Sequence, residues 1–224
     1  MLPSANSSFL FAAADCTGHG VPGAIMSVIC CNAMNDAVKK GAVHQPNLIL
    51  DHVREIVTGA FEERENYMTQ KDGMDIALVS LSPFPAAAEK VKLKFAGAYN
   101  PLWIIRKGRP PVKSKNVLAA DSHYLMEIKA DRQPIGIYEK MDPFTLHEMD
   151  VFKGDTLYVF SDGYADQFGG ESGGKFKYKS LKQLLLSIQD KTMDEQHDIL
   201  MKTFDDWKGE HEQVDDICMI GVRI

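Results

Sequence analysis

The sequence has few cysteines, and their arrangement fits neither a zinc site nor a disulfide framework. The four cysteines in the 224 residues are Cys16, Cys30, Cys31 and Cys218. Their spacing matches no pair of zinc ligands, and two adjacent cysteines do not easily pair with each other. We therefore expect reduced thiols, as in the cytoplasm.

Long apolar runs and basic segments are also scarce. No apolar run approaches the ~20 residues that a membrane span needs, and residues 1–8 lack the basic start of a signal peptide. The formal net charge is -6, so no global positive field attracts the phosphates of a nucleic acid. We expect a cytoplasmic domain with no nucleic-acid partner and no membrane contact of its own, although other domains could anchor the parent protein to a membrane.

The hydrophobic patterns predict an α+β fold. Buried or alternating runs predict strands over residues 9–14, 76–81, 91–96, 102–106, 144–149, 156–160 and 217–224. Helical spacing predicts helices over 22–40, 48–65, 179–189 and 193–207. Helices that cluster apart from a mostly antiparallel set of strands are typical of layered α+β domains. The glycine-rich residues 169–174 predict a flexible loop, and residues 1–8 a tail that is disordered or was added in cloning.

Three aspartates stand where an apolar run gives way to a turn or a polar stretch. They are Asp15 in ADCTGHG, Asp162 in FSDGY and Asp215 in VDDI. Carboxylates that come together from distant strand ends are suitable ligands for a hard divalent cation. Such a cation can convert water into a nucleophile and hold a phosphoryl group. The three segments together indicate a metal-dependent enzyme that cleaves phosphate esters.

Each segment alone also has a structural explanation. Asp162, followed by Gly163, could cap backbone amides in a turn, and Asp215 with Asp216 could belong to a solvated acidic face. His19 lies in a glycine turn that could cradle a phosphate or supply a proton, although a structural or solvated histidine is the commoner case. The metal site is therefore favoured by the joint occurrence of the three segments.

The segments around these aspartates are similar to those of a known family. The chain resembles the metal-dependent protein serine/threonine phosphatases of the type-2C superfamily, and most closely the bacterial stage-II-sporulation-E-like and sigma-regulation phosphatases. The matching segments occur in the family's order at residues 15–24, 96–102, 133–136, 161–163 and 215–217. The resemblance spans residues 9–224 and implies an αββα four-layer sandwich, with two mainly antiparallel sheets flanked by helices and two Mn²⁺ or Mg²⁺ ions.

The resemblance also implies roles for individual residues. Asp15 would bridge both ions, the backbone carbonyl of Cys16 would bind one of them, and Asp162 and Asp215 would hold the other. Asp216 matches a position that supports the ligands without binding an ion directly.

Four further residues have weaker implied roles. Asn100 lies in a matching segment near the site, and Gly163 follows a ligand. Asp72 is near the position of a third-ion ligand in some relatives. The general-acid role of a family histidine does not transfer to His19.

One feature of the family is missing. Its members have a strand with a Gly-Asp-aromatic-Tyr sequence shortly before the Asp15 motif, and the acid of that strand binds the second ion. Residues 1–14 contain no Asp or Glu. We therefore expect residues 9–224 to be an N-terminally truncated catalytic domain that lacks the first strand and is the C-terminal module of a larger regulator. Its site could hold one ion rather than two.

The implied activity is hydrolysis of phosphoserine or phosphothreonine on a regulatory protein, such as an anti-sigma-factor antagonist. Metal-activated water would attack phosphorus, so no side chain needs to act as nucleophile. An upstream sensor would act through the helices near 22–40 and 48–65. The alternative is a non-catalytic or weakly active phosphoprotein-binding module, because one ligand strand is absent. A nuclease or phosphodiesterase is disfavoured because the chain has no basic cluster.

Overall fold

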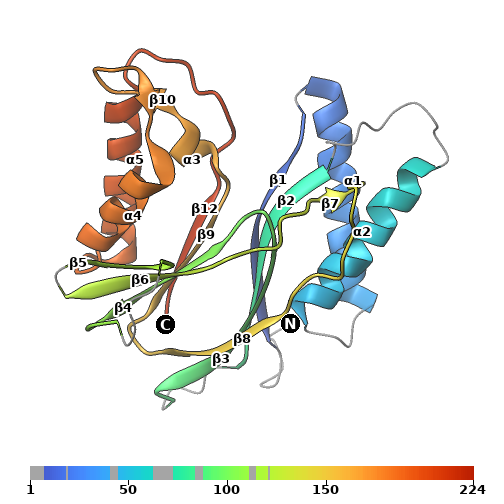
Figure 1. Cartoon of the computed structure of the whole chain (residues 1–224), viewed down its shortest axis with the longest axis horizontal. Helices are drawn as coiled ribbons and strands as arrows, with labels where there is room; N and C mark the ends of the chain where they lie inside the picture. Colours follow the sequence, from blue (N-terminus) through green and yellow to red (C-terminus); the bar gives the residue numbers. More distant parts are fainter. Residues whose placement is uncertain are drawn as a thin grey trace. The chain divides into compact units, whose positions relative to one another are not determined.

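The computed structural model describes residues 8–18, 20–40, 45–62, 73–83, 88–110, 115–120 and 122–224. These residues form two compact units, whose helices and strands are shown in Figure 1. Unit 1 comprises Met1–Leu102 and Lys129–Phe152, and unit 2 comprises Trp103–Ile128 and Lys153–Ile224. Each unit has its own sheet, its own helices and its own hydrophobic core.

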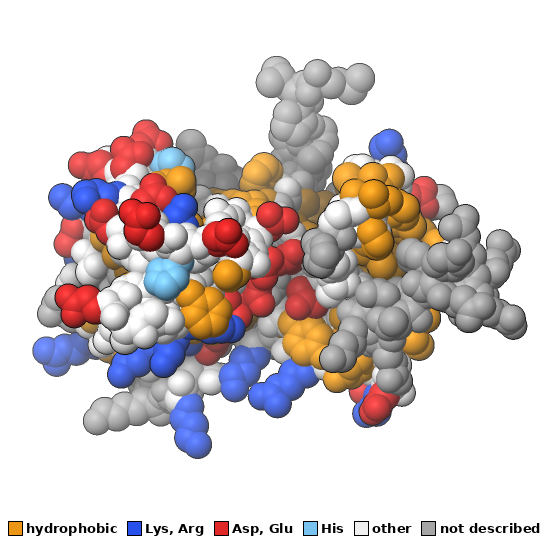
Figure 2. Space-filling model, turned by 90° about the horizontal axis from the view of Figure 1, so that it is seen from above, with side chains coloured by type: hydrophobic (Ala, Val, Ile, Leu, Met, Phe, Trp, Pro, Cys, Tyr) orange, Lys and Arg blue, Asp and Glu red, His pale blue; other side chains and the backbone are white. Residues whose placement is uncertain are grey.

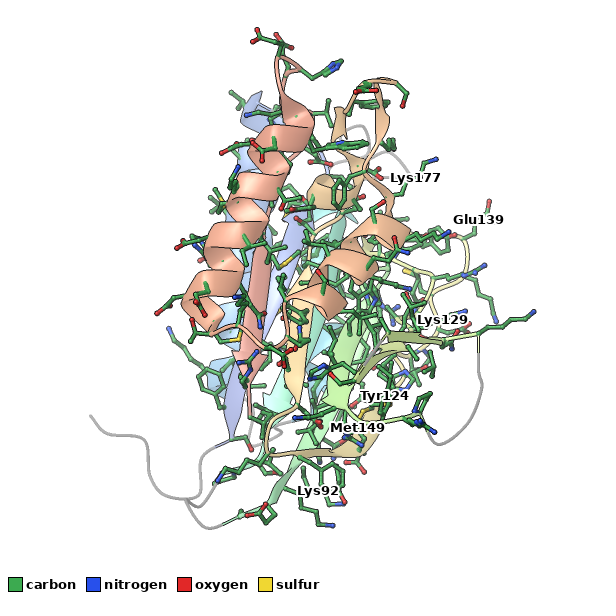
Figure 3. All side chains as sticks on the ribbon, turned by 90° about the vertical axis from the view of Figure 1, so that its left-hand side faces the viewer. Lys92, Tyr124, Lys129, Glu139, Met149 and Lys177 are labelled. Carbon is green, nitrogen blue, oxygen red and sulfur yellow. The ribbon has the colours of Figure 1, made fainter. Side chains whose placement is uncertain are left out.

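The sheet of unit 1 has the strand order β1-β2-β3-β8, with β7 paired to the start of β2. Its strands are β1 (Phe9–Cys16), β2 (Gly73–Leu81), β3 (Lys90–Ala98), β7 (Ile135–Gly136) and β8 (His147–Phe152). All the pairings are antiparallel. The first half of β3 alternates between exposed and buried positions, as its Val-Lys-Leu-Lys-Phe sequence predicts. Figure 3 shows Lys92 and Met149, which lie on the neighbouring strands β3 and β8.

Two helices cover the sheet of unit 1. Helices α1 (Gly20–Lys40) and α2 (Pro46–Glu62) lie side by side in Figure 1 and contact each other. Cys30 of α1 and Leu50 of α2 are buried together with Ile76 of β2 in one core cluster. Burial of these apolar faces holds the helices on the sheet.

Helix α1 is more apolar than the sequence pattern suggested. By length and composition alone, the 20 residues Gly20–Lys39 could cross a membrane, and the core helix of a globular protein passes the same test. Only 28% of the most apolar window of this stretch is buried. Its exposed apolar side chains include Val21, Ile25 and Val28. Helix α1 therefore presents an apolar surface in addition to the face that packs in the core.

The sheet of unit 2 has the strand order β12-β9-β4-β6-β5. Its strands are β4 (Leu102–Lys107), β5 (Val117–Ala120), β6 (His123–Ile128), β9 (Thr156–Phe160) and β12 (Met219–Arg223). Its helices are α3 (Gly163–Asp166), α4 (Lys177–Ser187) and α5 (Met193–Lys208). A capping box at Thr192 and Glu195 starts α5, since each side chain satisfies a backbone N–H of the other.

Aromatic rings fill the core of unit 2. The ring centroids of Trp103 and Phe160 are 4.4 Å apart. Tyr164 of α3 contacts Phe176 and Phe204, with centroid distances of 5.3 Å to each. Tilted and edge-to-face pairs of this kind add to the free energy gained by burial. They also fix the turn after β9, because Tyr164 lies only four residues beyond the end of that strand.

The predicted strand over 144–149 was wrong in its first half, because β8 begins only at His147. Side-chain acceptors hold the preceding backbone outside the sheet. The Phe144 N–H donates to Asp51 Oδ1 at 3.1 Å, and the Thr145 N–H donates to Asp131 Oδ2 at 2.7 Å. The alternation of apolar residues alone could not reveal these acceptors, because both are distant in sequence.

The prediction of a flexible loop at 169–174 was also wrong. These glycines belong to a short hairpin formed by β10 (Phe168–Gly169) and β11 (Gly174–Lys175). The Gly170 N–H donates to the Trp207 carbonyl at 2.8 Å. A Cβ on Gly169 would lie 1.9 Å from that same carbonyl oxygen. Glycine is needed here for close packing rather than for flexibility.

The predicted α+β class is confirmed, with two antiparallel sheets that each carry helices. The predicted helices agree with α1, α2, α4 and α5 to within a few residues at each end. Residues 63–65 of the second predicted helix and residues 1–7 of the predicted tail lie outside the described residues.

Candidate metal centre

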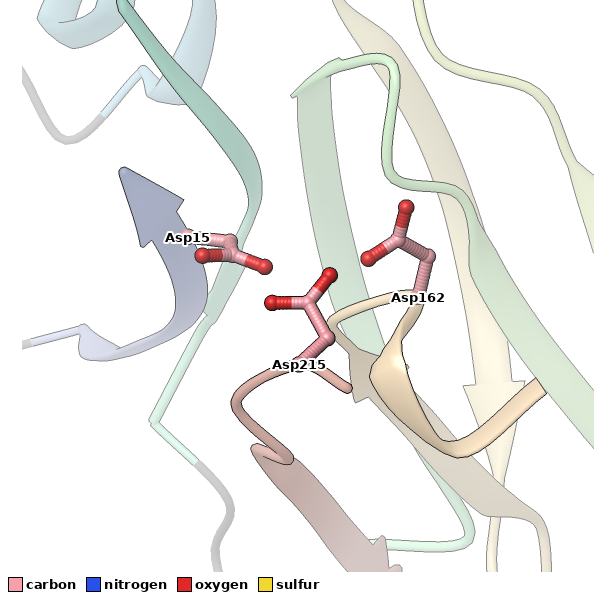
Figure 4. Close-up of side chains that lie close together, drawn as sticks. All are labelled: Asp15, Asp162 and Asp215. Atoms are coloured by element: carbon pink, nitrogen blue, oxygen red, sulfur yellow. The ribbon is translucent and has the colours of Figure 1, made fainter. Parts of the chain in front are cut away.

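Two of the predicted ligands lie together in unit 2. Asp162 follows the end of β9, and Asp215 precedes the start of β12. These strands are antiparallel neighbours in which Phe160 is opposite Met219, so both aspartates are at the same end of the sheet. A carboxylate oxygen of Asp162 lies within 4.8 Å of one of Asp215. Figure 4 shows the two side chains pointing toward each other.

Buried polar side chains hold the two loops that bear these carboxylates. Ser161 Oγ donates to the Asp216 carbonyl at 2.9 Å and accepts from the Cys218 N–H at 2.9 Å. Gln167 Nε2 donates to the Glu212 carbonyl at 2.8 Å. Both side chains are almost completely buried. Loss of one of these hydrogen bonds would leave a buried polar group without a partner and so destabilise the fold. The segment before β12 is therefore attached to the turn after β9 at two points.

Gly163 permits the close approach of these loops. A Cβ at this position would lie 2.5 Å from the Asp216 carbonyl oxygen and 3.3 Å from Asp215 Cβ. No larger residue fits without displacing the segment that bears Asp215. The predicted role of Gly163 near the ligands thus has a steric basis.

The electrostatics of the pair favour a cation. Burial raises the pKa of the Asp162 carboxyl, and the negative charges of Asp215 and Asp166 raise it further. Asp166 is itself paired with Lys175, whose Nζ lies 2.7 Å from its Oδ2. Two carboxylates that repel each other at close range gain free energy when a cation binds between them. Acidic side chains are prominent on the molecular face shown in Figure 2, in keeping with the net charge of -6.

Asp15 lies in unit 1, near the end of β1, and is drawn in Figure 4 as well. It is half-buried and stands opposite Asp75 of β2 in the strand register. Thr17 fastens the following turn to β2: its N–H donates to the Gly73 carbonyl at 2.9 Å, and its Oγ1 accepts from the Gly73 N–H at 2.8 Å. Asp15 is thus held by the strand ladder itself, since β1 continues through Cys16.

The thiol of Cys16 faces the interior of unit 1, where Cys16 packs against the core cluster. A hydrogen bond from the buried Cys30 thiol is the main cause that lowers the pKa of Cys16, to about 7. The same contact raises the pKa of Cys30. Because the Cys16 thiol packs against the core, the group of Cys16 that fits the predicted ligand role is its backbone carbonyl.

The other predicted site residues have mixed outcomes. Asp216 is exposed, and its N–H donates to Asp215 Oδ1 at 2.8 Å, which orients that carboxylate. Asn100 is buried in unit 1, and its Nδ2 has no hydrogen-bond partner among the described residues. Asp72 and His19 lie outside the described residues.

Sequence reasoning missed two residues beside these ligands. Gln167 is fully buried and organises the segment before β12, but no sequence pattern distinguishes it from a surface glutamine. Asp75 stands next to Asp15 across the β1–β2 ladder. An acid inside the apolar Gly-Met-Asp-Ile-Ala run was a signal that could have been noticed, because a charge in a buried strand needs a reason.

A family comparison identifies the chain. The model of the family described as stage II sporulation protein E (SpoIIE) matches residues 5–224. The chain belongs to this family. The expected relationship to phosphatases of the type-2C superfamily is thereby confirmed. Among curated proteins, none matches the chain.

Solved structures agree with this membership. The SiaA-PP2C domain of Pseudomonas aeruginosa is 27% identical, with a TM-score of 0.74 over 97% of this chain and 75% of that one. The PP2C phosphatase domain of SpoIIE from Bacillus subtilis, solved with a fragment of its regulatory domain, is 18% identical; the TM-score is 0.68, and the match covers 100% of this chain and 59% of that one.

A third structure is the catalytic domain of the serine/threonine protein phosphatase PstP, in complex with 2 manganese ions. It is 16% identical, with a TM-score of 0.53 over 99% of this chain and 91% of that one. At this identity the likeness concerns the fold. Family membership and fold together make this chain an enzyme domain of the PP2C-type serine/threonine phosphatase class.

Proposed function

We propose that the chain hydrolyses phosphoserine or phosphothreonine on a regulatory protein, with Mn²⁺ or Mg²⁺ as the cofactor. The observation that supports this most strongly is the Asp162–Asp215 pair, in which two carboxylates from different loops are held within 4.8 Å by interactions of the protein itself. Their only ligand atoms are oxygens, which suit these hard cations. When bound, such an ion activates water and stabilises charge on the phosphoryl oxygens.

In this proposal Asp15 and the Cys16 carbonyl are ligands as well. The family resemblance supports this assignment, as does the position of Asp15 at the end of a strand. Asp216 orients Asp215 through its N–H and does not bind the ion. Gly163 keeps the Asp215 segment close to Asp162. The structure of PstP, a relative of low identity, holds two manganese ions.

The regulatory partners belong to the same proposal. The substrate is a phosphorylated regulator, such as an anti-sigma-factor antagonist, in the cytoplasm. An upstream sensor acts through α1 and α2, which adjoin the turn after Asp15 in sequence. The exposed apolar residues Val21, Ile25 and Val28 on α1 support this, because exposed apolar side chains that gather on one helix suit a protein contact.

The test is Mn²⁺-dependent release of phosphate from a phosphoserine peptide. Asp162→Ala should lower kcat/KM by at least about a thousandfold, since it removes a ligand of the ion that activates water. The matched control is Asp198→Ala, which removes an exposed aspartate on α5 in the same unit and should leave activity unchanged. Equal activity in wild type and Asp162→Ala would refute the assignment.

Calorimetric titration with Mn²⁺ separates catalysis from mere binding. We expect Mn²⁺ binding in wild type and its loss in Asp162→Ala. A wild type that binds Mn²⁺ and phosphopeptide but releases no phosphate would instead support the phosphoprotein-binding module.

A further inference from the structure

A cavity lies between the helix α5 and the strand β12 of unit 2. Its volume is about 360 Å³, whereas a cavity of about 150 Å³ already holds a benzene ring. Apolar side chains from α5 and from residues 217–219 line it: Met193, Leu200, Met201, Ile217 and Met219. Three of them are methionines, whose flexible thioethers adapt to apolar groups of different shapes. The cavity therefore has the size and the lining to hold an aromatic side chain.

The polar side chains in the wall of this cavity take part in other interactions. The Tyr158 hydroxyl donates to Gln196 Oε1, and the Tyr164 hydroxyl donates to the Leu200 carbonyl at 2.9 Å. His197 stands at the rim, because its side chain is 72% exposed. Among the described residues of the wall, the buried polar side chains thus already have partners. The interior of the cavity therefore favours an apolar occupant over a polar one.

Beside the cavity, the outer edge of β12 has no strand partner among the described residues, since β12 is the first strand of its sheet. The Ile224 N–H, directly after β12, donates to the Asp155 carbonyl, directly before β9, at 2.9 Å. In an antiparallel ladder, residues that bond to the neighbouring strand alternate with residues whose backbone groups point away. Every second residue before Ile224 therefore bonds to β9, and the residues between them point outward. These are Met219, Gly221 and Arg223.

Strand β12 has little of the protection that exposed sheet edges usually carry. Lysine, proline or a bulge commonly keeps such an edge from pairing with another chain. The one charged residue of β12 is Arg223, and its guanidinium donates to the carbonyls of Lys191 and Gln189 in its own unit. Gly221 is exposed and has no side chain that would cover the edge. An extended polypeptide can therefore approach β12 and bond to its outward backbone groups.

The segment that surrounds the cavity is acidic. Residues 193–223, from the start of α5 to the end of β12, contain nine acidic residues and three basic ones. A polypeptide rich in lysine or arginine is attracted to such a region, whereas a nucleic acid or an anionic membrane is repelled. A second copy of this chain carries the same acidic segment and the same net charge of -6, so it is repelled as well.

We propose that β12 binds an extended basic segment of a partner protein as an additional antiparallel strand, and that the cavity beside α5 takes one of its aromatic side chains. In such a complex the backbone hydrogen bonds provide affinity, and the cavity selects the inserted side chain. Opposite residues of an antiparallel pair have their side chains on the same face. Gly221 lines the cavity, so the aromatic residue is the one opposite Gly221. This interaction surface does not depend on the phosphatase activity.

The probe is the synthetic peptide Lys-Val-Lys-Phe-Lys-Val-Lys, titrated calorimetrically into the whole chain. Its lysines share one face of the extended strand, and its phenylalanine is in the middle of the other face. We expect binding with a Kd below about 1 mM. Glutamate in place of every lysine should weaken binding at least about tenfold, because the acidic segment then repels the peptide. Equal binding of the two peptides would overturn the proposed basic partner.

Methyl groups on the peptide backbone test the strand pairing. In the proposed register the N–H groups of the phenylalanine and the valines point toward β12, and those of the lysines point away. N-methylation of the phenylalanine should therefore weaken binding at least about tenfold. N-methylation of the lysine before it is the matched control and should change Kd by less than about twofold. Equal effects of the two methyl groups would overturn the pairing.

A substitution in the cavity tests the inserted side chain. Met201→Ala should weaken binding of the peptide about threefold to tenfold, because the phenylalanine loses an apolar contact. Met141→Ala is the matched control, since Met141 belongs to unit 1 and is 50% exposed, compared with 51% for Met201. It should leave Kd unchanged. Both side chains are half-exposed, so both variants should fold, and circular dichroism checks this.

The remaining outcomes each contradict the inference. They are no binding of the first peptide to wild type, and equal Kd values for Met201→Ala and Met141→Ala. If N-acetylphenylalanine amide binds as tightly as the peptide, the cavity takes a small apolar molecule and the edge adds nothing. If wild type forms dimers in sedimentation and binds no peptide, a second copy covers β12. None of these measurements involves release of phosphate, so they decide the inference even if the phosphatase proposal fails.

Discussion

Unit 2 and unit 1 place their candidate ligands by different means. Asp162 and Asp215 of unit 2 stand on loops, and the buried side chains of Ser161 and Gln167 hold those loops together. Asp15 of unit 1 stands within a strand and is positioned by the β1–β2 ladder. A loop needs specific side chains for its shape, whereas a ladder needs only backbone groups.

This difference has consequences for tolerance to mutation. In unit 2, single substitutions in the loops or the core should disturb the carboxylate pair. In unit 1, most substitutions should be mild, because a backbone ladder survives the change of a side chain.

The largest expected effect concerns the ion pairs of the two units. In unit 2 the guanidinium of Arg106 donates to Asp155, with Nη2 2.6 Å and Nε 2.9 Å from its carboxylate oxygens, and Asp155 is buried. Arg106→Met should destabilise unit 2 by about 3 kcal/mol, because the buried carboxylate of Asp155 loses the cation that it faces. In unit 1 Lys94 pairs with the exposed Glu148. Lys94→Met should cost less than about 1 kcal/mol.

Urea unfolding can show which unit each of these substitutions destabilises. Both tryptophans, Trp103 and Trp207, lie in unit 2, so their fluorescence reports on that unit, while far-UV circular dichroism reports on both. Arg106→Met should shift the fluorescence transition strongly. Equal shifts for Arg106→Met and Lys94→Met would contradict the difference between the units.

The second comparison uses the same substitution in both units. Gly163→Ala in unit 2 places a Cβ 2.5 Å from the Asp216 carbonyl oxygen. It should destabilise by about 1–3 kcal/mol, as overpacking does, and weaken Mn²⁺ binding. Gly59→Ala in α2 meets nothing within 4 Å and should stabilise unit 1 by about 0.5–1 kcal/mol, because alanine is the better helix former. Thermal unfolding measures both, and changes of the same sign would show that the loop at Gly163 is not tightly packed.

The sequence predicts those parts of the site in which an aspartate lies near the end of a strand. Asp15 and Asp162 each follow an apolar run, so their positions depend on local pattern alone. The helices and most strands were predictable for the same reason. The hydrogen bonds of Gln167 with Glu212 and of Tyr164 with Leu200 join residues about 40 apart in sequence. No periodicity encodes such pairs, since they arise only when distant segments meet.

The hairpin at residues 168–175 is a second case in which a contact with a distant residue could not be predicted from local sequence. Its glycines predict a flexible loop, because glycine permits flexibility. In the structure they let the hairpin approach Trp207 closely. The sequence shows only that these positions lack a side chain. Whether a glycine makes the loop flexible or allows close packing depends on the residue next to it, which here is Trp207.

The smallest expected effect is a pH dependence in unit 1. Asp150 lies between Lys90 and Lys92, with Nζ–oxygen distances of 2.8 Å to each, and Figure 3 shows Lys92. The hydrogen bond from Lys90, and next that from Lys92, lower the pKa of Asp150 to about 2 from its usual 3.8. The pKa of Asp150 is lower in the folded protein than in the unfolded chain. Its interaction with the two lysines therefore stabilises the fold above pH 3.8, and this contribution is lost as the pH falls toward 2.

Asp150→Asn should therefore lower the midpoint of thermal unfolding slightly at neutral pH, and the difference from wild type should shrink below about pH 4. Circular dichroism at a series of pH values measures it. Added salt should shrink the neutral-pH difference as well, because both lysines are exposed. A difference that stays constant with pH would mean that Asp150 acts through packing instead of charge, and unit 1 would then depend on specific side chains as unit 2 does.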